Sequence, residues 1–436
     1  MYRSLSNLLN RLLALPLAYW VVAGFLVAYY LLFITPSLFN SGGYMYFFRT
    51  VPATNPGATD LQQMLSYSQE LNLGNTPYIG QNLYPPLASV IFLPLLNLTF
   101  QNAYQLLTGL SFLSLLGSVW LLLRVSLKKA GSISIGAIIG VSALFGYGLQ
   151  FELERGQFNL IPMFLVFVAA WLFHSAPRWR ILAYTLFVVA VQVKFYPFIF
   201  ILLFVKNWRA WKENILRFVV LAVVNVGIFF VLGVTVFQQF LAGIIQQAVS
   251  PYVWIGNHSI KAFVSLTTTK GTEPFYFSQW SLIAEHHNRT QVVLLACVAG
   301  VLLLTLIRAY RRNSRGIDPY ILLACTVGAL VIPSVSHDYK LSILAVPVAY
   351  LLMYESALTR RGRTGLASLI ALSGISLFYA TTLFSFENKS QLVVQNNFAW
   401  FFQNNFPALF LILLCVGVLA TRDLLYPSQK ASVPVG

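Results

Sequence analysis

The residues best suited to chemistry lie in predicted loops and at predicted helix junctions. Asp60 is the first of them, in Thr59-Asp60-Leu61-Gln62, where Thr59 and Gln62 form a capping-box pattern that opens a helix. Leucine and methionine side chains follow on one face as far as Gly74, which predicts an amphipathic helix lying along a membrane interface. The Asp60 carboxylate either complements the dipole of this helix or acts as a general base beside a cavity.

A second polar group lies in Glu152-Leu153-Glu154-Arg155-Gly156-Gln157-Phe158-Asn159, at the predicted junction of two helices. Its chemistry comes from Glu152, Glu154, Arg155, Gln157 and Asn159. Ionisable groups at membrane depth are costly unless they pair or face a wet cavity. Two interpretations therefore stand: a local ion pair of Arg155 with Glu152 or Glu154, and a substrate-binding site.

Lys194, in Val193-Lys194-Phe195-Tyr196-Pro197, separates two short apolar segments and is far from any basic loop. Non-helical backbone at that depth is tolerated where it lines a cavity or is buried in protein. The ammonium group either snorkels to the membrane surface or forms an anion site.

Three further motifs carry polar or aromatic groups. Tyr84 precedes the tandem prolines Pro85-Pro86, Asn257-His258-Ser259 lies in a long loop, and Ser336-His337-Asp338-Tyr339-Lys340 joins two helices. A histidine beside an aspartate can hydrogen-bond to a sugar or a phosphate. No His/Asp spacing of a known metal-ligand pattern occurs, so we predict no metal, and no phosphate-binding loop of the soluble nucleotide-binding type is present.

The elements that must position these residues follow from composition. The chain has 436 residues, of which 58% are hydrophobic and 9% are charged, whereas soluble domains carry about 25% charged residues. Apolar runs of about 20 residues recur between short basic loops, and in a bilayer such runs must be helices. We predict an all-α polytopic membrane protein with one transmembrane domain over 1–436.

The charge distribution predicts the topology. Of the 28 lysine and arginine residues, 20 fall on one side together with four acidic residues, so the net charge of +16 is the positive-inside bias of a membrane protein. No partner role for nucleic acid follows from it. The 20 residues are Arg3, Arg11, Arg124, Lys128, Lys129, Arg178, Arg180, Lys206, Arg209, Lys212, Arg217, Arg308, Arg311, Arg312, Arg315, Arg360, Arg361, Arg363, Arg422 and Lys430.

With both termini cytoplasmic, about 12 crossings are predicted. They span 17–39, 103–123, 131–149, 158–174, 181–193, 195–205, 216–237, 291–307, 319–334, 341–356, 365–384 and 406–421. Residues 85–99 are apolar but do not fit the alternation, which predicts a re-entrant or half-helix. The extracytoplasmic segments are 40–84, which carries the interfacial helix, 238–290 and the shorter 385–405. Residues 422–436 form a cytoplasmic tail.

The order of the motifs resembles glycosyltransferase family 87, whose best-known members are polyprenyl-phosphate-mannose-dependent α-mannosyltransferases. The resemblance covers residues from about 40 to 345. Its motifs are, in order, Asp60, Gly74 with Pro77-Tyr78, Tyr84-Pro85-Pro86-Leu87, Gly156-Gln157-Phe158-Asn159-Leu160, Lys194-Phe195-Tyr196-Pro197 and Asn257-His258-Ser259. It implies a GT-C-type fold, an outward-facing cavity, a lipid-linked sugar donor and an inverting displacement.

By this resemblance Asp60 takes the position of the catalytic base. We expect Lys194, His337, Lys340 and Arg155 to bind the donor phosphate, since a departing polyprenyl phosphate gains charge. The expected substrate-binding residues are Tyr84, Glu152, Glu154, Gln157, Asn159, Asn257 and His258.

The expected enzyme is thus a hexosyltransferase of the cell membrane with an extracytoplasmic active site. Its partners are a polyprenyl-phosphate-linked sugar, most simply mannose, a glycan or glycolipid acceptor and the lipid bilayer. We expect no cofactor and no obligate protein partner. The alternative is a transporter or flippase for a lipid-linked glycan, which predicts repeated halves and charges at the bilayer midplane. No internal repeat occurs in the sequence.

Overall fold

The computed structural model describes residues 15–29, 57–80, 82–126, 130–144, 146–250, 253, 256–266, 285–358, 366–377 and 404–426. Parts of the predicted crossings 17–39 and 365–384, of the segments 40–84, 238–290 and 385–405, and of the tail 422–436 lie outside these residues. So do the basic residues of 1–14, 127–129 and 359–365 and Lys430.

The described chain is helical, and its β-structure is a single bridge between Asn257 and His337. The first half of the chain contains α2 (Leu17–Tyr29), α4 (Thr59–Asn72), α5 (Pro86–Phe92), η3 (Leu93–Asn97), α6 (Phe100–Ser126), α7 (Ala130–Leu144), α8 (Tyr147–Arg155), α9 (Leu160–Ser175), η4 (Pro177–Trp179), α10 (Arg180–Val193) and η5 (Tyr196–Leu203). The second half contains α11 (Trp211–Ile228), α12 (Val234–Val249), α13 (Ile260–Leu266), α15 (His287–Arg312), α16 (Pro319–Val331), η6 (Asp338–Ile343), α17 (Ala345–Leu358), α18 (Leu366–Leu377) and α20 (Phe406–Leu425).

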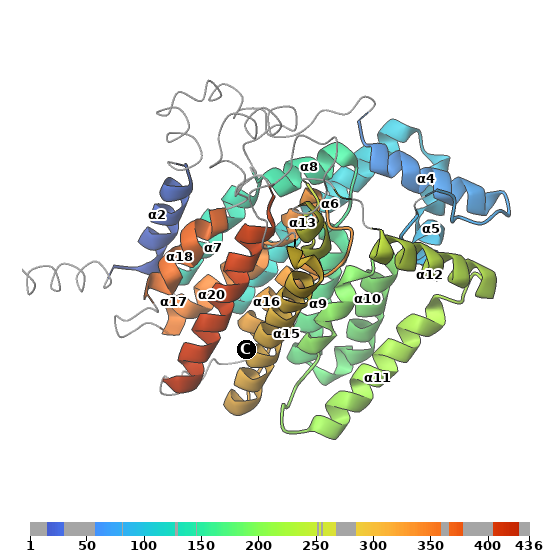
Figure 1. The fold of residues 1–436 in the computed structure, drawn as a ribbon. Coiled ribbons are helices and arrows are strands. Elements are labelled where there is room, and N and C mark those ends of the chain that lie inside the picture. The colour runs from blue at the N-terminus through green and yellow to red at the C-terminus, as the bar shows by residue number, and fades with distance from the viewer. Residues whose placement is uncertain are drawn as a thin grey trace, which may run out of the picture.

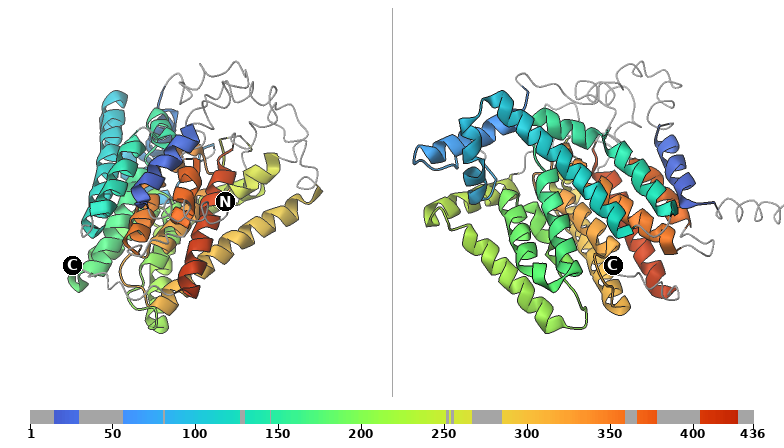
Figure 2. Two further views of the ribbon diagram at one scale, coloured as in Figure 1. Left: turned by 90° about the vertical axis from the view of Figure 1, so that its left-hand side faces the viewer. Right: turned by 180° about the vertical axis from the view of Figure 1, so that it is seen from behind.

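Hydropathy explains which helices lie inside. Every residue of α16 is buried, and α15, α17 and α20 surround it, as expected of a helix that is apolar all round. The peripheral α11 buries only Asn214, Leu221 and Asn225. Seen from behind, the long α6 runs obliquely across the bundle (Figure 2) and packs on α7 and α9.

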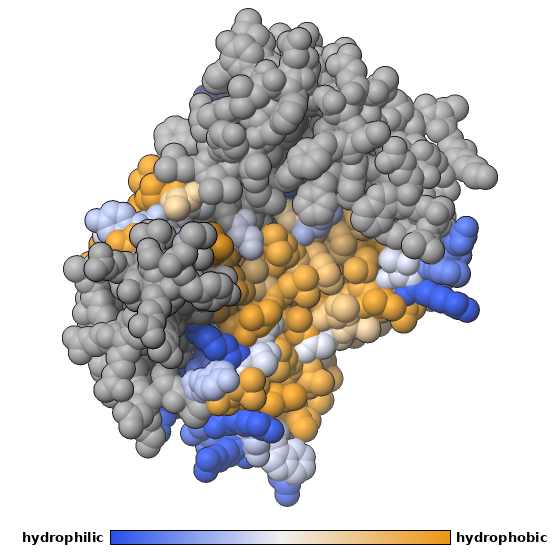
Figure 3. All heavy atoms as spheres, turned by 60° about the vertical axis from the view of Figure 1, so that its left-hand side comes forward, coloured by the Kyte–Doolittle hydropathy of each residue, from blue (hydrophilic) through white to orange (hydrophobic). Residues whose placement is uncertain are grey.

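The outer surface has membrane character. Figure 3 shows a broad area of hydrophobic side chains with hydrophilic residues at its margins. Four helical segments of the described chain are long and apolar enough to cross a membrane: Phe100–Arg124, Ile133–Arg155, His287–Arg312 and Phe406–Leu425. The number of twelve crossings stays a prediction, as does a re-entrant placement of α5 and η3, which occupy the predicted half-helix 85–99.

The two ends of the bundle differ. In Figure 1, α4 and α8 lie at the upper end, and the turns that follow α9 and α15 and precede α11 lie at the lower end. Among the described residues, these lower turns hold arginines and lysines predicted to be cytoplasmic, such as Arg178, Arg209 and Arg315. We call the lower end the basic end.

Candidate functional site

Four segments bring polar side chains together near α4 and α8. Helix α4 carries Asp60, the junction of α8 and α9 carries residues 152–159, and Lys194 follows the last residue of α10. Tyr84 comes from the stretch before α5. Segments far apart in the sequence therefore form one cluster, which we call the Asp60 cluster: Asp60, Tyr84, Arg155, Gln157, Asn159 and Lys194.

Backbone geometry docks α4 onto the end of α8. The Ala58 N–H donates to the carbonyl of Glu154 at 2.8 Å, and Ala58 takes a left-handed conformation with φ 57°. Gly156 also has a positive φ, 65°, and a Cβ there would lie 2.8 Å from Cβ of Leu61. Since only glycine fits both constraints, Gly156 is what allows α4 to approach this closely.

The start of α4 differs from the sequence prediction. Ala58, not Thr59, is the N-cap residue, and no side chain caps the helix. The predicted capping box is therefore wrong: the N–H of the N-cap residue, which a capping box would bond to the side chain at the third helical position, donates to the Glu154 carbonyl instead. The helix itself forms, but its apolar residues Leu61 and Met64 are buried in a small core with Phe92 and Phe158. A position along the membrane interface stays a prediction.

Both carboxylate oxygens of Asp60 accept strong hydrogen bonds. Oδ1 accepts from Nη2 of Arg155 at 2.6 Å, and Oδ2 accepts from Nε2 of Gln157 at 2.5 Å. The ion pair of Arg155 is thus with Asp60, 95 residues away in the sequence, and not the local pair that sequence proximity offered. Charge-assisted bonds of this kind fix the orientation of a carboxylate.

Lys194 is held by neutral oxygens. Its Nζ donates to Oε1 of Gln157 at 2.5 Å and to Oδ1 of Asn159 at 2.8 Å, and the residue is 6% exposed. The ammonium also lies 4.5 Å from the ring centroid of Phe158. The interpretation that Lys194 snorkels to the membrane surface is therefore wrong, because its ammonium group is buried. Burial lowers the pKa of Lys194 to about 8, while the charges of Glu152 and Asp60 oppose that shift.

Glu152, on α8, is buried and close enough to Lys194 for its charge to act on that ammonium. Its Oε1 accepts from the Leu160 N–H at 3.0 Å, and Oε2 accepts from the hydroxyl of Ser342. The contact with Ser342 requires η6 to lie directly on α8. Gly148 makes that possible, because a Cβ there would lie 2.5 Å from the backbone nitrogen of Ser342.

The segment 337–340 adds a histidine and a lysine near the cluster. Lys340 donates to the carbonyl of Val335 at 2.7 Å, and burial together with the charge of Lys194 lowers its pKa to about 7. Burial, with the charge of Lys340, lowers the pKa of His337 to about 3. At neutral pH His337 therefore has no charge, and its expected interaction with a phosphate reduces to a hydrogen bond.

Asn257 and His258 belong to a different arrangement. The side chain of His258 contacts Asp338 Oδ1 and Ser336 Oγ, each at 3.1 Å, and Asn405 donates to Asp338 at 2.8 Å. Asn257 donates to the carbonyl of Ser334 at 3.0 Å. All these side chains are buried, so they join the loop before α13 to the loop before η6. Their substrate-binding role stays a prediction.

Sequence reasoning missed several residues of the site. Tyr67 is buried on α4, and burial followed by the charge of Asp60 raises its pKa. It lies seven residues after Asp60 and hence on the same helical face, a signal that was available. Tyr196, whose hydroxyl donates to the Asn159 carbonyl at 2.7 Å, stands in the motif that contains Lys194 but received no role of its own, and Ser342 gave no signal.

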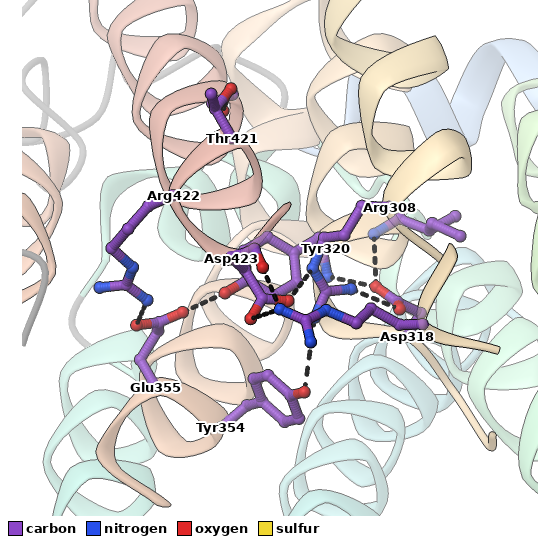
Figure 4. A network of polar contacts seen from close by, with 11 residues as sticks. Arg308, Asp318, Tyr320, Tyr354, Glu355, Thr421, Arg422 and Asp423 are labelled. Carbon is purple, nitrogen blue, oxygen red and sulfur yellow. Dashed lines mark hydrogen bonds and ion pairs between the residues drawn. The ribbon is translucent and has the colours of Figure 1, made fainter. Parts of the chain in front are cut away.

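A second group of buried charges lies at the basic end (Figure 4). Arg308 contacts Asp318 at 2.7 Å and Asp423 at 2.8 Å, and it stacks over the ring of Tyr320. Arg422 pairs with Glu355 at 2.6 Å. We call this group the Arg308 network, and it joins α15, α16, α17 and α20.

The described residues contain no group of three or more His, Cys, Asp or Glu side chains able to hold a metal ion. In the Asp60 cluster the cations are a lysine and an arginine, and each oxygen of the carboxylate accepts one hydrogen bond.

Comparison with known proteins adds one match. The family model described as Glycosyltransferase family 87 matches residues 82–336. This range includes Tyr84, residues 152–159, Lys194, Asn257 and His258, and it leaves out Asp60, His337 and Lys340. No curated protein matches the chain.

Proposed function

Because the chain belongs to glycosyltransferase family 87, we propose that it moves a hexose, most simply mannose, from a polyprenyl-phosphate donor to a hydroxyl of a glycan or glycolipid. The reaction takes place at the extracytoplasmic face of the cell membrane and inverts the anomeric centre. Asp60 is the general base.

The observation that carries this proposal is the link between Asp60 and Lys194. One amide, that of Gln157, contacts both the carboxylate and the ammonium, at 2.5 Å each. A proton acceptor and a cation thus lie on either side of a single side chain, and this proximity supports the proposal that both act at one sugar carbon. Tyr67 and Tyr84 are close enough to Asp60 for its charge to raise the pKa of both phenols. Their rings and hydroxyl groups could contact a sugar bound there.

The chemical step balances with these groups. The acceptor oxygen forms a bond to C1 of the hexose as its proton passes to Asp60, and the bond from C1 to the phosphate oxygen breaks with its electron pair. The leaving polyprenyl phosphate changes from a singly charged diester to a monoester with additional negative charge. Lys194 and Lys340 supply positive charge for that oxygen in a site with little water.

The test is transfer from labelled polyprenyl-phosphate hexoses to a panel of glycan and glycolipid acceptors, with purified protein and with the Asp60→Asn variant. General-base catalysis contributes about 10²–10⁴-fold to a rate, so we expect the variant to lose transfer to that extent while it still binds donor. Glu70→Gln, at the other carboxylate of α4, is the matched control and should keep wild-type activity.

Full activity of Asp60→Asn would refute the assignment of the base. Transfer from a soluble sugar nucleotide alone would refute the lipid donor. Translocation of a lipid-linked glycan without product would favour the transporter alternative instead.

A further inference from the structure

We propose that Gln157 is a positioning residue, whose side-chain amide holds the Asp60 carboxylate and the Lys194 ammonium in fixed relation and makes no contact with substrate. This inference rests on the proposed function, since it concerns the base and the cation of that reaction. It assigns to Gln157 a role different from the substrate binding expected from the sequence.

The two ends of the amide meet opposite charges. Nε2 donates to Asp60 Oδ2, and Oε1 accepts from Lys194 Nζ. Turning the amide by 180° would place its N–H groups against an ammonium and its oxygen against a carboxylate. The charges on either side therefore determine the orientation, and the dipole of the amide lies along the line from carboxylate to ammonium.

The surrounding structure holds this side chain in place. Gln157 is 3% exposed, and its backbone N–H donates to the carbonyl of Glu152 at 2.8 Å. The preceding Gly156 turns the chain out of α8 through its left-handed conformation. Nε2 also lies 3.2 Å from the hydroxyl of Tyr84, so both polar atoms of the side chain are in use within the protein.

The two restraints on Asp60 also orient the base. With Gln157 on Oδ2 and Arg155 on Oδ1, the plane of the Asp60 carboxylate is fixed, and its remaining lone pairs have defined directions for the acceptor hydroxyl. Loss of the amide removes one of these two restraints and one of the two hydrogen bonds of Lys194. Misplacement of a reacting group by about 1 Å can cost about a hundredfold in rate.

The substitution Gln157→Glu gives a specific test. While the introduced carboxyl group is protonated it reproduces both bonds, because its carbonyl accepts from Lys194 and its hydroxyl donates to Asp60. Once ionised, it presents a second negative charge to Asp60 and has no donor left. The activity of Gln157→Glu should therefore approach wild type at acidic pH and fall as the pH rises and the shared proton is lost.

The experiment is the pH profile of kcat, with KM for the acceptor, for wild type, Gln157→Glu and Gln157→Leu. We expect Gln157→Leu to lose about a hundredfold in kcat at every pH with little change in KM. Gln63→Glu makes the same chemical change at an exposed position of α4 and should keep the wild-type profile. If Gln157→Leu does not fold, the nearly isosteric Gln157→Glu still decides the question.

A wild-type pH profile for Gln157→Glu, or a wild-type kcat for Gln157→Leu, would overturn the positioning role and leave the proposed function intact. A change confined to the acceptor KM would show substrate contact and overturn it as well. Absence of transfer by the wild-type protein would overturn the proposed function, and with it this role.

Discussion

The Asp60 cluster and the Arg308 network are both buried groups of charges, but their cations have different partners. In the Arg308 network each arginine meets a carboxylate: Arg308 contacts Asp318 and Asp423, and Arg422 contacts Glu355. In the Asp60 cluster only Arg155 does so. Lys194 and the neighbouring Lys340 donate to amide and backbone oxygens, which carry no net charge.

We infer that this difference separates a structural role from the functional one proposed for the Asp60 cluster. A buried ion pair whose partners neutralise each other holds segments in register and offers nothing to a ligand. A buried cation that contacts only neutral oxygens has lost its hydration without gaining an opposite charge. Burial accordingly lowers the pKa of both Lys194 and Lys340. An anion that binds beside such a cation stabilises its charged form and offsets the free energy lost on desolvation. Perturbed groups of this kind mark functional sites.

The largest expected effect comes from breaking the Arg308 network. Arg308→Met leaves Asp318 and Asp423 buried without their main partner, since only Arg312 remains on Asp423. Removing one member of a buried ionic network costs about 3–5 kcal/mol. We expect a large fall in the thermal unfolding midpoint of the purified protein in detergent, measured by intrinsic fluorescence.

The matched control is Arg311→Met, three residues along the same helix and exposed, which should change stability by about 0.5 kcal/mol or less. An Arg308 variant as stable as this control would show that the network contributes little to the fold, and the contrast between the two regions would fail.

A smaller effect of a different kind is expected at Lys194. Lys194→Met should lower transfer by about a hundredfold, because removing one group that stabilises developing charge costs that much. Stability should change little: the loss of two hydrogen bonds is offset by the removal of a desolvated charge. Activity and unfolding midpoint, measured on the same preparation, check both statements.

Lys261 provides the comparison, since its ammonium also donates to backbone oxygens, those of Ala248 and Val249. Lys261→Met should leave transfer unchanged. A marked drop in stability without loss of turnover in Lys194→Met would place Lys194 with the structural cations of the basic end.

The helices could be predicted closely from apolar run length. The run predicted at 103–123 is α6 (Phe100–Ser126), and that at 319–334 is α16 (Pro319–Val331). The run 216–237 was too long: α11 ends at Ile228, and a turn with Gly233 at φ 97° precedes α12. The residues between are as apolar as the helix, so hydropathy has no signal for this break.

The site could be predicted as a set of residues but not as a set of contacts. Charge type and motif order indicated Asp60, Arg155 and Lys194. For Arg155 the sequence offered either a local ion pair or a substrate-binding role, and nothing in it pointed to Asp60 as the partner. Its true partner depends on the left-handed backbone at Ala58 and Gly156, which docks α4 on α8. The same limit applies to the Arg308 network. From sequence its arginines are predicted to lie in cytoplasmic turns, and only the packing of α20 on α15 and α16 brings them to their carboxylate partners.

The smallest expected effect is the pH dependence of donor binding at Lys340. Because burial and Lys194 lower the pKa of Lys340 to about 7, part of the free protein lacks this charge at neutral pH. A bound phosphate favours the ammonium form and raises that pKa, so binding takes up a proton where free Lys340 is deprotonated. Affinity for polyprenyl phosphate should fall above about pH 7, by no more than about tenfold per pH unit for one proton. Below about pH 6 the phosphate itself takes up a proton, which also weakens binding.

Titration calorimetry with short-chain polyprenyl phosphate in buffers of different ionisation enthalpy measures both the affinity and the proton uptake. In Lys340→Arg the guanidinium stays charged throughout, so the fall should move to higher pH, where Lys194, with its pKa of about 8, loses its proton. Arg311→Met changes a cation at the basic end and should keep the wild-type curve. Affinity independent of pH in the wild type would mean that the bound anion does not raise the pKa of Lys340. Lys340 would then contribute no more to phosphate binding than Arg308, whose charge is neutralised by its own carboxylates.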